Sequence, residues 1–125
     1  MSKAKIEKYI PEVMVVLNNK FSDGVAPKEF NGYISSFGAS IIQSGLKATV
    51  ALFENQNANS VQDRSCLTKI ILEVLGADEE NLLTHILNNQ DNEELLKEKI
   101  ISIAVAIKLS LRTFELKKGL TNVVC

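Results

Sequence analysis

Hydrophobic residues recur along this chain three or four positions apart, which is the spacing of an amphipathic helix. The clearest stretch spans residues 33–54 and divides at Gly45. Its apolar positions are Ile34, Phe37, Ile41 and Ile42 before the break, and Leu46, Val50, Leu52 and Phe53 after it. Glycine tolerates the positive φ that often follows a helix. This stretch therefore predicts two helices that meet at Gly45.

The same periodicity predicts about six helices within one domain, residues 1–125. The expected ranges are 3–19, 27–44, 46–56, 61–75, 78–89 and 92–118. Pro11 either starts or kinks the first helix, and Pro27 suits the first turn of the second. Asp78 is expected to cap the fifth helix, and Asp91 with Glu94 to form a capping box before the sixth. Strand-like alternation is nearly absent, so the fold class expected is all-α: a compact single-domain helical bundle with a long C-terminal helix.

The predicted last helix is unusual because its apolar positions form two stripes. The first stripe is Leu96, Ile100, Ile103, Ile107, Leu111 and Phe114, and the second is Ile101, Val105, Leu109 and Leu116. A helix with two apolar stripes is covered on both sides. Either it is the central helix of the bundle, or one stripe meets another protein. In the second case Val105 and Leu109, or the face around Tyr33, are the candidate partner interface.

Charge is nearly balanced, with 14 basic and 15 acidic residues and a formal net charge of −1. A strongly basic nucleic-acid binder is therefore excluded, and any RNA contact must come from a local patch. Basic side chains gather near the C-terminus, at Lys108, Arg112, Lys117 and Lys118. By themselves they are better explained as a solvated face that complements the helix dipole than as a nucleic-acid patch.

Residues suited to catalysis or metal binding are sparse. His85 is the only histidine, and one histidine with scattered carboxylates is not a metal site. Cys66 is expected to be a small buried hydrophobe and Cys125 a mobile terminal residue, without a disulfide framework. No phosphate-binding glycine motif, signal peptide or membrane-length apolar run occurs. We therefore expect no enzymatic activity, no cofactor and no metal, in a reducing cytoplasm.

The segment from Tyr33 to Phe53 resembles the small α-helical subunit of type III-B CRISPR RNA-guided effector complexes, the Cmr complexes. That family carries a tyrosine, an apolar helix, an Asn/Ser-Gly-Leu break and a short helix that ends in an aromatic residue. Here these features are Tyr33, residues 37–42, Ser44-Gly45-Leu46 and Phe53. Tyr9-Ile10-Pro11 and the basic pair Lys117 and Lys118 also fit. The proline often found near Ser40 and the tryptophan often found near Glu115 are missing, which leaves the small subunit of a type III-A complex as an alternative.

The resemblance implies a non-catalytic subunit of antiviral defence that stacks along a ribonucleoprotein filament. Its implied partners are the large polymerase-like subunit, the repeated backbone subunits, further copies of itself, and the guide and target RNA. The implied RNA-binding residues are Lys47, Lys108, Arg112, Lys117 and Lys118. A helical protein-interaction domain that binds no RNA is the main alternative from another class. An enzyme based on His85 and Cys66 is the third.

Overall fold

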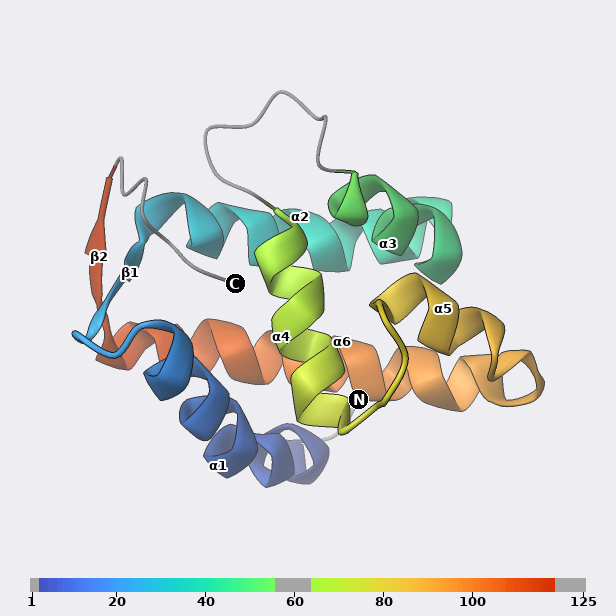
Figure 1. Cartoon of the computed structure of the whole chain (residues 1–125), viewed down its shortest axis with the longest axis horizontal. Helices are drawn as coiled ribbons and strands as arrows, with labels where there is room; N and C mark the ends of the chain where they lie inside the picture. Colours follow the sequence, from blue (N-terminus) through green and yellow to red (C-terminus); the bar gives the residue numbers. More distant parts are fainter. Residues whose placement is uncertain (1–2, 56–63, 119–125) are drawn as a thin grey trace.

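The computed structural model describes residues 3–55 and 64–118, and α-helices make up most of them (Figure 1). The six helices are α1 (Lys3–Lys20), α2 (Lys28–Ser44), α3 (Leu46–Glu54), α4 (Ser65–Leu75), α5 (Leu82–Leu87) and α6 (Glu93–Ser110). Two 3-10 turns, η1 (Gln90–Asn92) and η2 (Leu111–Thr113), flank α6. Two short strands, β1 (Val25–Pro27) and β2 (Glu115–Lys117), pair in parallel. The predicted all-α class and the long C-terminal helix are confirmed.

Helix α6 is the central element of the bundle. Helices α1 and α2 lie on opposite sides of it, and α4 crosses and contacts it (Figure 1). The first apolar stripe forms the core, since Leu96, Ile100, Ile103, Ile107, Leu111 and Phe114 are all buried. The second stripe reaches the surface: Ile101 and Val105 are half-buried, and Leu109 is 36% exposed. Central packing therefore accounts for one stripe and leaves part of the other uncovered.

The predicted helix over residues 92–118 is wrong at its C-terminal end, because α6 stops at Ser110. From Phe114 the backbone is extended, and the Glu115 N–H donates to the Gly24 carbonyl at 2.9 Å. Phe114 packs edge-on against Phe21, with ring centroids 6.2 Å apart. Strand β2 thus pairs with a segment from the other end of the chain. A three-residue strand shows no alternation of its own, so the sequence contains no local signal for this pairing.

Several helix boundaries also differ from expectation. Pro11 lies inside α1, so it does not start that helix. Pro27 ends β1 in an extended conformation, immediately before α2, and is not part of the first helical turn. Asn81, rather than Asp78, caps α5, and its side chain accepts the Thr84 N–H at 2.8 Å.

The expected capping box before the last helix does not form. Helix α6 begins at Glu93, and Asn92 precedes it without a side-chain cap. The predicted loop over residues 55–60 and the predicted helix start at Val61 lie almost wholly outside the described residues, which resume at Arg64.

The break between α2 and α3 is where the sequence predicted it. Gly45 has φ 94° and ψ 164°, and its N–H donates to the Ile41 carbonyl at 2.9 Å. The reversal lets Phe37 and Phe53 meet edge-on, with ring centroids 5.1 Å apart. Gly45 therefore joins two helices whose apolar faces share one core.

We expect Gly45→Ala to lower the free energy of unfolding by about 1 kcal/mol, because an L side chain is strained at this positive φ. Gly38→Ala is the matched control: Gly38 lies inside α2, and a methyl group added there would enter open space. That control should stabilise the protein by about 0.5–1 kcal/mol. Urea unfolding followed by circular dichroism measures both, and a Gly45→Ala variant as stable as the parent would contradict the assignment.

Candidate functional site

Four of the five predicted RNA-binding residues lie at one end of the molecule. Lys108 is in the last turn of α6, Arg112 is in η2, and Lys117 and Lys118 are at the end of β2 and just after it. The Lys108 Nζ donates to the Ser35 Oγ on α2 at 3.1 Å. Arg112, Lys117 and Lys118 are exposed. The structure therefore places these cations at the end of α6 that carries the two strands (Figure 1).

Sequence reasoning missed one further member of this group. Pro27 is the register partner of Lys117, so Lys28, the next residue along the chain, begins α2 at the same end of the molecule as Lys117. Lys28 is exposed at the start of α2. We call Lys28, Lys108, Arg112, Lys117 and Lys118 the terminal basic patch. Only the strand pairing could have identified Lys28, because nothing in the local sequence links it to the C-terminus.

Two acidic residues lie close to the terminal basic patch in the chain, since Glu29 follows Lys28 and Glu115 is in β2. Lys117 pairs with Glu115 at 3.9 Å, and both side chains are more than half exposed. Such an exposed pair contributes little stability and leaves the ammonium group open to other anions. The patch therefore has the character of an anion-binding surface, in a protein whose overall charge is close to zero.

Lys47, the fifth predicted residue, is not part of this patch. It lies at the start of α3 and pairs with Glu93, the first residue of α6, at 3.4 Å. Helix α6 has 18 residues and is therefore about 27 Å long. Lys47 and the terminal basic patch are thus at opposite ends of α6.

The predicted interface residues come from two helices. Val105 and Leu109 lie one turn apart on α6, and Tyr33 lies on α2, half-buried against the core. Leu109 is the most exposed of the three. Val105 and Leu109 belong to the uncovered part of the second α6 stripe. Leu109 is adjacent to Lys108, so this apolar surface borders the terminal basic patch.

His85 takes part in a polar cluster at α5. Its Nδ1 lies 2.9 Å from the Glu79 Oε1, and its backbone carbonyl accepts the Asn89 side-chain amide at 2.7 Å. The hydrogen bond with His85 lowers the pKa of Glu79. Across residues 3–55 and 64–118, no group of three or more His, Cys, Asp or Glu side chains could hold a metal ion. The contact between Glu79 and His85 joins α5 to the loop before it.

Cys66 is buried in α4, as predicted, with 3% of its surface exposed. Cys125 lies outside the described residues. Within the described segments, no helix is both long enough and apolar enough to span a bilayer.

The fold and its surface define a small α-helical domain with a basic patch at one end of its central helix. A family model described as CRISPR-associated protein (Cas_Cmr5) matches residues 8–109. The chain therefore belongs to this family, the small subunits of type III-B CRISPR complexes, and the resemblance seen at residues 33–53 is confirmed. Comparisons with curated proteins and with solved structures found no match. The matched range includes Lys28 and Lys108 and ends before Arg112.

The Glu79–His85 contact predicts a pH dependence of stability. Because the folded-state pKa of Glu79 lies below its ordinary value of 4.5, its contribution is present above that pH and is lost as the pH falls through the lowered pKa. We expect Glu79→Gln to be less stable than the parent at pH 7, with the difference shrinking below about pH 4. Urea unfolding at pH 7, 5 and 3 tests this. The exposed neighbour Glu80, changed to Gln, should show no such trend, and identical pH profiles for both variants would refute the role of Glu79.

Proposed function

We propose that this chain is a non-catalytic small subunit that stacks along a type III-B CRISPR effector filament in the cytoplasm and contacts RNA in antiviral defence. The family match over residues 8–109 supports membership of the complex. The terminal basic patch is the observation that supports the proposed contact with RNA. The proposed protein partners are the large polymerase-like subunit, the repeated backbone subunits and further copies of this chain.

The chemistry of the patch suits contact with the RNA backbone. Ammonium and guanidinium groups bind phosphate oxygens and carry no base information themselves. A subunit that must accept any guide sequence requires this kind of contact, since base pairing supplies the specificity. With a net charge of −1, one copy binds weakly, and repeated copies along a filament add avidity. Lys47 is a separate candidate contact at the other end of α6.

No catalytic step is part of this proposal. His85 is hydrogen-bonded to Glu79, and Cys66 is buried in the core, so each side chain has a structural role. The proposal therefore gives neither side chain a catalytic role. We therefore assign this chain a binding and assembly role.

The double variant Arg112→Glu and Lys117→Glu should weaken RNA binding by the assembled complex about tenfold, because two phosphate contacts are lost in each copy. The slope of log affinity against log salt should become shallower by about 1–2 per copy. Fluorescence anisotropy with a labelled RNA at several salt concentrations measures both quantities. The isolated variant should keep its helical circular dichroism spectrum, because both side chains are exposed.

The matched control is Lys3→Glu with Lys69→Glu, which makes the same charge change at exposed positions on α1 and α4. This control should retain parental affinity and salt slope. Equal weakening in the two double variants would show a general charge effect. Unchanged binding in both would favour a protein-interaction subunit that makes no RNA contact of its own.

For stacking, Leu109→Asp should reduce incorporation of this subunit into the complex, because a charge then occupies the uncovered part of the second α6 stripe. Leu109 is 36% exposed, so the isolated variant should remain folded. Ile42→Asp is the control, since Ile42 is an apolar residue on α2 with 81% exposure. The measurement is the number of copies of this subunit per complex after co-purification. Equal incorporation of both variants would place the interface elsewhere.

A further inference from the structure

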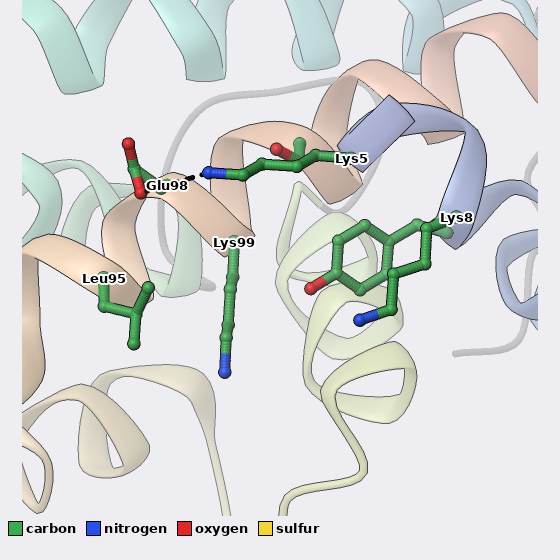
Figure 2. Close-up of a pocket in the computed structure, with 7 residues that line it drawn as sticks. Lys5, Lys8, Leu95, Glu98 and Lys99 are labelled. Carbon is green, nitrogen blue, oxygen red and sulfur yellow. Dashed lines mark ion pairs between the residues drawn. The ribbon is translucent and has the colours of Figure 1, made fainter. Parts of the chain in front are cut away.

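A small hollow of about 140 Å³ lies between α1 and the first half of α6 (Figure 2). It is lined by Lys5, Lys8, Tyr9, Leu95, Glu98, Lys99 and Ser102. Sites for whole small molecules usually measure about 300–1,000 Å³. The hollow is therefore sized for one side chain or chemical group of a larger partner, rather than for a free small molecule.

The hollow presents two cations that no described carboxylate neutralises. Lys5 reaches the Glu98 carboxylate at 3.7 Å. Lys8 and Lys99 extend toward the other edge of the hollow (Figure 2), and neither forms an ion pair with a described residue. The Lys8 Nζ lies 5.9 Å from the centre of the Tyr9 ring. A negatively charged group that entered here would meet both ammonium groups.

A buried hydroxyl also lines the hollow. Ser102 is 1% exposed, and its Oγ has no hydrogen-bond partner among the described residues. Leaving a buried hydroxyl unpaired costs free energy, which an incoming oxygen acceptor would recover. Burial also raises the pKa of the neighbouring Tyr9 hydroxyl, with a further contribution from Glu12. The hollow thus offers a buried hydroxyl donor beside two cations, which suits a carboxylate or another oxyanion.

A second, larger hollow of about 590 Å³ adjoins the first and shares Lys8, Tyr9 and Lys99 with it. It continues along α1 to the C-terminal end of α4, where its apolar lining is Val15, Val16, Val74 and Leu75. Val15 is 62% exposed, and Leu95 at the rim of the small hollow is 52% exposed. Large apolar side chains thus line both hollows and are left uncovered in the isolated chain.

We propose that these two hollows form one groove, the α1 groove, that docks an amphipathic helix of another protein subunit through its apolar face and one carboxylate; this inference rests on membership of the effector complex. A carboxylate of that helix enters the small hollow beside Lys8, Lys99 and Ser102, and its apolar side chains cover Val15 and Leu75. From Lys5 to Val16 the groove follows α1 for about 16 Å, or three helical turns. That length accommodates the i, i+3, i+4 and i+7 anchors of a helix in a groove.

The lining favours a protein over RNA. Glu98, Glu12 and Glu73 lie in the same two hollows as the three lysines. Regularly spaced phosphates would meet these carboxylates, whereas a helix can place single acids and apolar residues to match them. Helix α1, which lines both hollows, lies across α6 from α2, and the first residue of α2 belongs to the terminal basic patch (Figure 1). The proposed contacts with protein and with RNA therefore lie on different faces of the subunit.

Site-specific crosslinking in the assembled complex tests the occupant directly. A photoreactive benzoylphenylalanine at Val15 should crosslink to a protease-sensitive, RNase-resistant partner whose modified peptide contains Asp or Glu. The control position is Leu52, which is 49% exposed on α3. An RNase-sensitive adduct, an adduct to another copy of this chain, or a yield no higher than at Leu52 would overturn the proposal.

Charge reversal tests the small hollow. Lys8→Glu with Lys99→Glu should lower incorporation of this subunit at least tenfold, while Lys3→Glu with Lys69→Glu should incorporate normally. The Ser102→Ala variant should be incorporated several-fold less well than the parent, although the isolated variant should be at least as stable as the parent. A serine that served only the stability of the fold would instead lower the stability of the isolated protein when replaced. Equal incorporation of the Lys8/Lys99 variant and the parent would overturn the proposal. Failure of the unmodified chain itself to enter the complex would instead contradict the proposed function.

Discussion

Burial of one apolar stripe on α6 is the interaction on which the rest of the structure depends. Ile100, Ile103 and Ile107 are fully buried, and α1, α2 and α4 all contact this helix. Removing a single buried isoleucine side chain typically costs about 2–5 kcal/mol, a large part of the stability of a small domain. The other helices take their positions from this stripe, so both candidate surfaces depend on it too.

Because α6 is covered from two sides, it separates two faces with different chemistry. The strand end combines Lys108 with Lys28 and Lys118, whereas the α1 side combines lysines with carboxylates and exposed apolar groups. A protein with a net charge of −1 can present a basic patch only if its acids lie elsewhere, and several of them line the α1 groove. This segregation matches the proposed contacts with RNA on one face and with another protein subunit on the other.

The sequence predicted those parts of the fold that local pattern controls. Helical periodicity identified the helices, and Gly45 marked the reversal between α2 and α3. The prediction was wrong for residues 114–118, where the spacing of apolar residues continues as if in a helix although the backbone becomes extended. Here the long-range pairing with β1 and the packing of Phe114 on Phe21 override local helical spacing. Three-residue strands are too short to leave a recognisable pattern.

By itself, the sequence determined the helical class, the Gly45 break, the buried stripe of α6 and the family. Only the tertiary structure decided which charged residues become neighbours. It brought the strand that precedes Lys28 to the strand that carries Lys117, separated Lys47 from both, and placed Lys8 and Lys99 at one hollow. The physical reason is that helices form from contacts a few residues apart, whereas a surface patch is assembled by packing between distant segments. Individual charged side chains contribute little to that packing, so their spacing in the sequence does not reveal it.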